Sequence, residues 1–146
     1  MEIALIYLDT SALTKLVIAE DESNNLRIWL AEHAEHRLVS SALVRTELRR
    51  AVLRLTDRPD VSRTQAQAAA GAATALLREL DQIRLGYPLL DRAGHHPPAR
   101  LRSLDAIHLV TAASLGPDLH TMVAYDHRLL DAARDLGIAV ASPGMP

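Results

Sequence analysis

The stretch IALIYLD (residues 3–9) is a continuous apolar run that ends on an aspartate. A run of this kind, without a polar residue at every second position, is typical of a strand that a parallel sheet buries on both faces. The residues from Ser11 to Glu20 then have the pattern of a helix. Asp9 therefore stands at the junction of a buried strand and a helix.

The rest of the chain continues this alternation. Further strands are predicted at Arg37–Ser40, Ile83–Tyr87, Thr121–Ala124 and Ile138–Val140. Further helices are predicted at Ser23–Ala34, Ser41–Leu55, Ser62–Leu80, from Leu104 to Gly116, and at His127–Leu136. This spacing indicates an α/β fold built from βαβ units, with a mostly parallel sheet of about five strands covered by helices on both faces.

Local signals set some of the boundaries. Ser62 and Gln65 have the spacing of a capping box, and Ser103 is a candidate N-cap for the helix that follows it. The segment Asp91–Arg102 is polar and contains Gly94, Pro97 and Pro98, so we expect a loop there. No linker or internal repeat interrupts the chain, and we expect a single domain spanning residues 1–146.

Composition excludes several classes of site. The chain of 146 residues is 49% hydrophobic, carries a formal net charge of -2 and contains no cysteine. The absence of cysteine excludes disulfides, thiol nucleophiles and thiolate zinc sites. The first apolar run ends at Asp9, which is too early for a membrane-spanning helix or the apolar part of a secretion signal. We expect a soluble, cytoplasmic protein with no membrane partner.

Four acidic residues are the candidate catalytic and metal-binding groups: Asp9, Glu47, Asp105 and Asp126. Asp9 and Asp126 each follow a predicted strand, and ligands of open α/β sheets bind beyond the carboxyl ends of the strands. Glu47 and Asp105 lie on helices that can point toward the same edge. Carboxylates that converge repel one another, and a bound divalent cation is the usual means of offsetting that repulsion.

Each acid also has a simpler explanation. Asp9 and Asp126 can cap the helices that follow them, and Asp105 suits a helix N-terminus. Glu47 can be a solvated or paired side chain, because arginines lie close to it in the sequence. His108 lies one helical turn after Asp105, and we expect a hydrogen-bonded, partly buried histidine rather than a metal ligand.

Other functions that use similar patterns fit less well. A phosphatase of the haloacid dehalogenase type needs a second aspartate two residues after the first, and that position is Ser11. A receiver domain needs a lysine after a late strand, whereas the only lysine is Lys15. Dinucleotide and P-loop sites need a glycine-rich first loop. None of these sites matches the sequence.

Four segments together resemble PIN-domain ribonucleases of the VapC toxin type: YLDTSAL, SSALVRTELRRA, LRSLDAIHLVTA and VAYDHRLLDAARDLGIAV. The similarity runs from Ile3 to Val140. It implies a three-layer αβα sandwich, and it implies that the four acids are catalytic. Thr10 and Ser11 match the family's small hydroxyl residues. Ala124 departs from the pattern, because many members have serine or threonine there.

The resemblance also implies the chemistry and the partners. We expect an endoribonuclease that depends on Mg²⁺, or alternatively Mn²⁺, and that acts as the toxin of a type II toxin-antitoxin pair. RNA would be the substrate, a VapB-type antitoxin the inhibitor, and a homodimer the assembly. Four acids suffice for one metal or for two. The alternative is a PIN-like module that binds RNA or a protein without cleaving RNA.

Overall fold

The computed structural model describes residues 3–146. Five strands form one sheet in the order β3-β2-β1-β4-β5, and every pairing is parallel. The strands are β1 (Leu5–Leu8), β2 (Arg37–Ser41), β3 (Asp81–Ile83), β4 (Leu119–Val123) and β5 (Val140–Ala141). The first strand of the sequence is therefore the central strand of the sheet, as its unbroken apolar run predicts.

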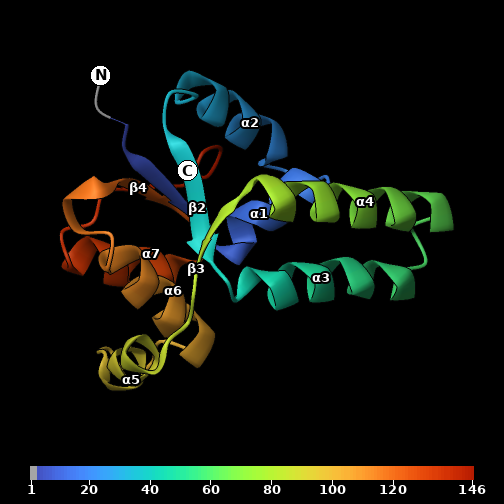
Figure 1. The fold of residues 1–146 in the computed structure, drawn as a ribbon. Coiled ribbons are helices and arrows are strands. Elements are labelled where there is room, and N and C mark those ends of the chain that lie inside the picture. The colour runs from blue at the N-terminus through green and yellow to red at the C-terminus, as the bar shows by residue number, and fades with distance from the viewer. Residues whose placement is uncertain (1–2) are drawn as a thin grey trace.

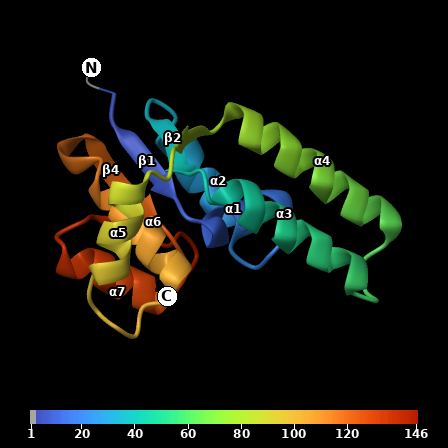
Figure 2. The ribbon, with the colours of Figure 1, turned by 60° about the horizontal axis from the view of Figure 1, so that its bottom comes forward.

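In the described part of the chain, seven α-helices connect and cover the strands (Figures 1 and 2). They are α1 (Thr10–Val17), α2 (Ser23–Glu32), α3 (Val44–Arg54), α4 (Arg63–Glu79), α5 (Tyr87–His95), α6 (Ser103–Ala113) and α7 (His127–Asp135). Short 3₁₀ turns lie at Leu55–Asp57 and Gly116–Asp118. Among residues 3–146, no helix is long and apolar enough to cross a membrane.

The sheet separates two hydrophobic cores. Ile6 and Leu8 of β1 pack against the core formed with α1, α2, α3 and α4, whereas Tyr7 packs against the core formed with α5, α6 and α7. All three side chains are fully buried, because successive side chains of a strand point to opposite faces and helices cover both. The predicted three-layer αβα sandwich is confirmed.

Helices α3 and α4 form a long antiparallel pair that projects from one side of the sheet (Figures 1 and 2). The predicted capping box begins α4: the Ser62 hydroxyl accepts from the Gln65 backbone N–H, and the Gln65 side chain accepts from the Ser62 backbone N–H. Small side chains on α4, including Ala69 and Ala73, are buried in the core that α3 shares. These small side chains let α4 pack against α3.

The segment between β3 and α6 differs from the prediction. The predicted strand Ile83–Tyr87 is wrong, because β3 ends at Ile83 and Tyr87 begins α5. The predicted loop Asp91–Arg102 is also wrong in its first part, since α5 continues to His95. Leu89 and Ala93, one helical turn apart, are buried in the core that α6 shares. This burial outweighs the polar composition that suggested a loop.

The start of α6 needs a smaller correction. Ser103 is the first helical residue rather than the N-cap, which is Arg102, and Arg102 makes no side-chain capping bond. The other predicted elements agree with the structure to within a few residues at their ends. The glycine expected to close the last helix, Gly137, has a φ of 76°, a conformation that glycine adopts without strain.

Candidate functional site

Four helices begin at the carboxyl edge of the sheet, and each places one of the four acids there. Asp9 is the N-cap of α1, and Asp126 is the N-cap of α7. Glu47 lies in the first turn of α3, and Asp105 lies in the first turn of α6. The partial positive charge of a helix N-terminus favours a carboxylate. The four helix N-termini thus partly offset the repulsion among the four carboxylates.

Asp9 is almost completely buried, with 4% of its surface exposed. Its Oδ1 atom accepts hydrogen bonds from the Ser11 hydroxyl at 2.6 Å and from the Ala12 backbone N–H at 3.0 Å. Burial raises the pKa of Asp9, and repulsion by Asp105 raises it further. Attraction by His108 and the two hydrogen bonds lower the pKa, but they do not outweigh burial. The expected capping role is confirmed, and the same carboxylate also lies within electrostatic reach of a second acid.

Glu47 is held by two donors from other elements. Its Oε1 atom accepts from the Thr10 hydroxyl at 2.5 Å and lies 2.8 Å from Nε2 of His108. Burial by itself would raise the pKa of Glu47, but the hydrogen bonds from His108 and Thr10 outweigh it, and the pKa is lowered. Glu47 is therefore a fixed carboxylate and not a solvated surface group.

Asp105 links the four acids electrostatically. Burial raises the pKa of the Asp105 carboxyl, and repulsion from Asp126 and Glu47 raises it further, against the attraction of His108 and Arg102. Since Asp105 also raises the pKa of Asp9, every other acid interacts with Asp105. The sequence prediction that the four acids gather at one edge is supported by this pattern of mutual repulsion.

The Ser11 hydroxyl connects two strand ends. It donates to Asp9 and accepts from the backbone N–H of Tyr125, which directly precedes Asp126. Asp126 is solvent-exposed, and its Oδ1 atom accepts from the Leu129 backbone N–H at 3.0 Å, which confirms its capping role. Ala124 is fully buried in the core against α5, α6 and α7 and carries no hydroxyl; the Ser11 hydroxyl bonds to this strand end instead, through the Tyr125 backbone N–H.

The donor set suits a hard divalent cation, although it is not preassembled. As they stand, no three histidine or acidic side chains within residues 3–146 form a group that could hold a metal ion. Mg²⁺ does not need such a group, because it is usually held by one or two carboxylates and keeps several waters. After burial, which is the larger cause, repulsion by Asp126 and Glu47 raises the pKa of Asp105 further, and a bound cation would relieve that repulsion.

The other histidines singled out in the sequence lie elsewhere. His95 and His96 are at the C-terminal end of α5, where their Nδ1 atoms contact the backbone carbonyls of Asp91 and Pro97. Among the hydrogen bonds of residues 3–146, none joins either histidine to one of the four acids. Of the arginines near this segment, Arg102 attracts the Asp105 carboxylate.

Sequence reasoning missed the link from the acids to the sheet interior. The sequence predicts a hydrogen-bonded, partly buried His108. The hydrogen bond is present, with Nδ1 at 2.7 Å from the Tyr7 hydroxyl, but the side chain is more deeply buried than predicted, with only 2% exposed. Its second contact, to Glu47, was not expected. The one available signal was the spacing of three residues from Asp105, which places His108 on the same helix face.

Comparison with known proteins agrees with this architecture. The PIN domain family matches residues 6–135. Ribonuclease VapC46 of Mycobacterium tuberculosis is 44% identical over 140 residues, covering 96% of this chain and 98% of the relative. The match extends beyond the acidic segments to nearly the full length of both proteins.

Two solved structures share the fold. The M. tuberculosis protein VapC20, described as a toxin that cleaves the sarcin-ricin loop, has a TM-score of 0.63 at 19% identity and covers 87% of this chain and 94% of its own. A chain of VapBC2 from Rickettsia felis, bound to a DNA fragment from the promoter of its own genes, has a TM-score of 0.56 at 14% identity and covers 94% of this chain and 97% of its own. The fold, the acidic edge and the full-length relative lead to one conclusion: the chain belongs to the PIN-domain family and is a VapC-type member of it.

Proposed function

We propose that this protein is a divalent-metal-dependent endoribonuclease and the toxin of a type II toxin-antitoxin pair. The observation that carries the proposal is the placement of the four carboxylates at helix starts on the carboxyl edge of the sheet, where burial and then repulsion by Asp126 and Glu47 raise the pKa of Asp105. The full-length relative named as a ribonuclease supports RNA as the substrate. The alternative is a module with the same geometry that binds RNA or a protein and does not cleave RNA.

In this proposal Asp9, Glu47, Asp105 and Asp126 hold Mg²⁺ or Mn²⁺. The bound cation supplies Lewis-acid chemistry that stabilises negative charge on a scissile phosphate. The protein orients the ligands: Ser11 and the start of α1 hold Asp9, and Thr10 and His108 hold Glu47. Arg102, which is exposed and close enough to Asp105 to influence its pKa, offers a cation for a neighbouring RNA phosphate.

A cleavage assay tests the function. Purified protein is incubated with total RNA in the presence of Mg²⁺ or Mn²⁺, and new RNA ends are mapped. Asp9→Asn and Asp105→Asn are the site variants, and Asp135→Asn, an exposed acid at the far end of α7, is the matched control. We expect discrete ends with wild type and with Asp135→Asn, and none with the site variants or with a chelator.

Two other outcomes would count against this function. Equal cleavage by the Asp9→Asn variant would reveal a contaminating nuclease or a different active site. RNA binding by folded protein without any new ends would favour the non-catalytic module.

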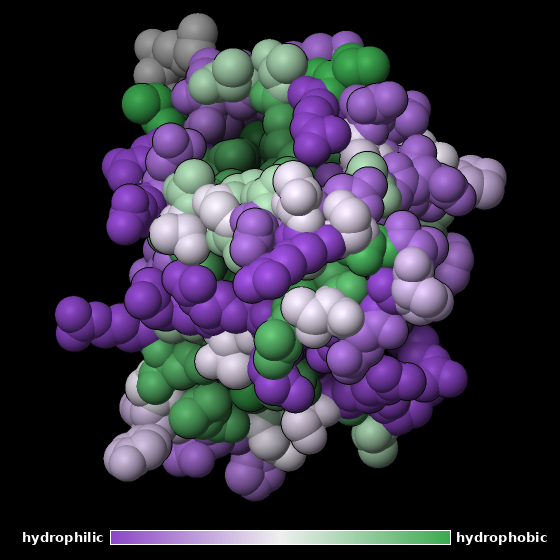
Figure 3. All heavy atoms as spheres, turned by 90° about the vertical axis from the view of Figure 1, so that its right-hand side faces the viewer, coloured by the Kyte–Doolittle hydropathy of each residue, from purple (hydrophilic) through white to green (hydrophobic). Residues whose placement is uncertain are grey.

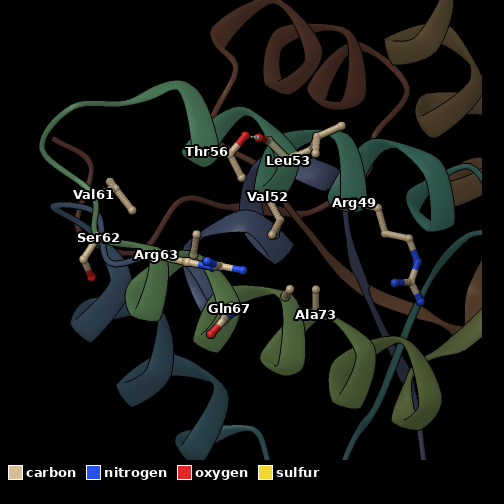
Figure 4. Close-up of a pocket in the computed structure, with 11 residues that line it drawn as sticks. Arg49, Val52, Leu53, Thr56, Val61, Ser62, Arg63, Gln67 and Ala73 are labelled. Carbon is tan, nitrogen blue, oxygen red and sulfur yellow. Dashed lines mark hydrogen bonds between the residues drawn. The ribbon is translucent and has the colours of Figure 1, made fainter.

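We further propose that an antitoxin binds in the groove between α3 and α4. This cavity of about 530 Å³ is lined by apolar side chains that include Val52 and Ala73 between the helices and Val61 at the end next to Ser62 (Figure 4). Arg63 extends into the space between the two helices, and Arg49 lies further along α3 (Figure 4). Apolar side chains beside arginines suit an amphipathic segment that carries acidic residues.

The surroundings of this groove are polar. The side of the molecule toward which α3 and α4 project is mostly hydrophilic, with small hydrophobic patches between the polar residues (Figure 3). An apolar groove in such a surface marks a binding site more often than it marks a solvated face. The VapBC2 complex, in which a protein of the same fold is found, supports an antitoxin as the partner.

Two arginine substitutions separate this docking site from catalysis. Ala70 is exposed and lines the groove, whereas Ala68 is also exposed on α4 but is not among the residues that line it. We expect Ala70→Arg to abolish antitoxin rescue of cell growth while RNA cleavage persists, and Ala68→Arg to leave both unchanged. Full rescue of Ala70→Arg would place the antitoxin elsewhere.

A homodimer, the assembly expected from the resemblance, would show as twice the chain mass in light scattering.

A further inference from the structure

We propose that His108 is a positioning residue, which fixes Glu47 through one carboxylate oxygen and leaves the other oxygen to face the acidic site. The inference rests on the proposed function, in which Glu47 is a metal ligand. His108 itself would touch neither the metal nor the RNA. It would act through the orientation of Glu47.

His108 connects the interior of the sheet to the site. It lies on α6 with 2% of its surface exposed. One ring nitrogen, Nδ1, is 2.7 Å from the hydroxyl of Tyr7 on β1, and the other, Nε2, is 2.8 Å from Oε1 of Glu47 on α3. The rings of Tyr7 and His108 meet edge to face, at 75° with centroids 5.9 Å apart. Three elements therefore hold the imidazole in a single orientation.

The hydrogen-bond donors and acceptors fit together in only one neutral arrangement. A carboxylate oxygen only accepts, so the proton of the neutral imidazole must be on Nε2. In the neutral ring Nδ1 then carries a lone pair and accepts from the Tyr7 hydroxyl, whereas in a cationic ring Nδ1 would donate to that oxygen; Nε2 donates to Glu47 in both forms. Burial raises the pKa of Tyr7 far above its usual range, so this phenol remains a donor. Among residues 3–146, every fully buried side-chain polar atom has a partner.

Both donors to Glu47 meet the same oxygen. The Thr10 hydroxyl and Nε2 of His108 contact Oε1, at 2.5 and 2.8 Å. The hydrogen bonds found within residues 3–146 thus leave Oε2 without a partner. Two donors on one oxygen prevent the carboxylate from rotating, and the second oxygen is presented in a fixed direction. Partners that orient a metal ligand in this way typically change metal affinity or activity by about 10- to 100-fold.

Two substitutions of His108 separate positioning from packing. A glutamine side chain is long enough to place an amide N–H near the position of Nε2, so His108→Gln can still donate to Glu47. An asparagine ends near the position of Nδ1, so His108→Asn can still pair with Tyr7 but cannot reach Glu47. If His108 had only a structural role, the two variants would lose stability and keep the metal affinity of the wild type.

The test is a Mn²⁺ titration followed by electron paramagnetic resonance, without RNA, alongside the RNA cleavage rate and the thermal midpoint. We expect His108→Asn to weaken Mn²⁺ binding and to slow cleavage by about 10- to 100-fold. His108→Gln should restore most of both. Wild-type Mn²⁺ affinity in a folded His108→Asn variant would overturn the inference, and so would equal losses in the two variants.

Glu47→Gln distinguishes this failure from a failure of the proposed function. If wild type binds Mn²⁺ and Glu47→Gln does not weaken binding, then Glu47 is not a ligand and both proposals fall. If Glu47→Gln weakens binding but His108→Asn does not, only the inference about His108 falls.

One further measurement uses the wild-type protein, so it does not depend on whether a variant folds. Nitrogen-15 chemical shifts of the His108 ring report which nitrogen carries a proton. We expect a proton on Nε2. A neutral ring protonated only on Nδ1 could not donate to Glu47 and would refute the positioning role.

Discussion

Asp9→Asn should raise the thermal midpoint of the metal-free protein while it abolishes activity. Asparagine keeps an Oδ1 acceptor for the Ser11 hydroxyl and the Ala12 backbone N–H, the two donors seen in the structure. As an N-cap, asparagine is about as good as aspartate. The substitution thus removes the cost of burying a charge and the repulsion by Asp105, and it also removes the attraction by His108, while the start of α1 stays capped.

The size of the effect follows from opposing terms. Repulsion between two like charges about 4 Å apart ranges from about 1 kcal/mol in water to about 4 kcal/mol near a protein surface. The lost attraction between the carboxylate and the N-terminus of α1 offsets about 0.3 to 1 kcal/mol of that gain. The lost attraction by His108 is a further offset. The net gain is therefore about 0 to 3 kcal/mol, which would raise the midpoint by up to roughly 10 °C in a chain of this size.

The assay is thermal unfolding in chelator, with Asp9→Ala as the matched control. Alanine removes the cap, which costs about 0.5 to 2 kcal/mol, so this variant should melt below Asp9→Asn. The pKa of Asp9 is raised in the folded state, so its contribution to stability is present below the unfolded pKa of about 3.9 and is lost as pH rises through the folded pKa. The advantage of Asp9→Asn should therefore grow as pH rises from about 4. A midpoint below wild type at neutral pH would refute this reasoning.

Two further predictions concern other parts of the fold. Ser62→Ala breaks the capping box of α4 and should cost about 0.5 to 2 kcal/mol in a denaturant titration; an unchanged midpoint would mean that the Gln65 bond suffices. The pKa of Glu47 is lowered, so its stabilising contribution is present above the unfolded pKa of about 4.3 and is lost as pH falls through the folded pKa. Wild type should therefore lose stability on acidification that Glu47→Gln does not lose, and parallel pH profiles would contradict the bond to His108.

Local signals in the sequence were sufficient for most of the architecture. The run from Ile3 to Asp9 predicted the central strand, and the pair Ser62 and Gln65 predicted the start of α4. These features depend on neighbouring residues only, because period and capping involve positions within four residues of one another. The prediction for the segment that forms α5 was wrong for the opposite reason. The burial of Leu89 and Ala93 against α6 creates it, and that contact cannot be read from a polar local composition.

The sequence by itself determined the four acids and their places at strand and helix ends. Only the tertiary structure decided how they are held. The bond between Glu47 and His108 joins residues 61 positions apart, and the bond between Tyr7 and His108 joins residues 101 positions apart. No periodicity in the sequence encodes such distances. They arise when β1, α3 and α6 pack around the same buried edge, because a buried polar group must find its partner wherever the fold supplies one.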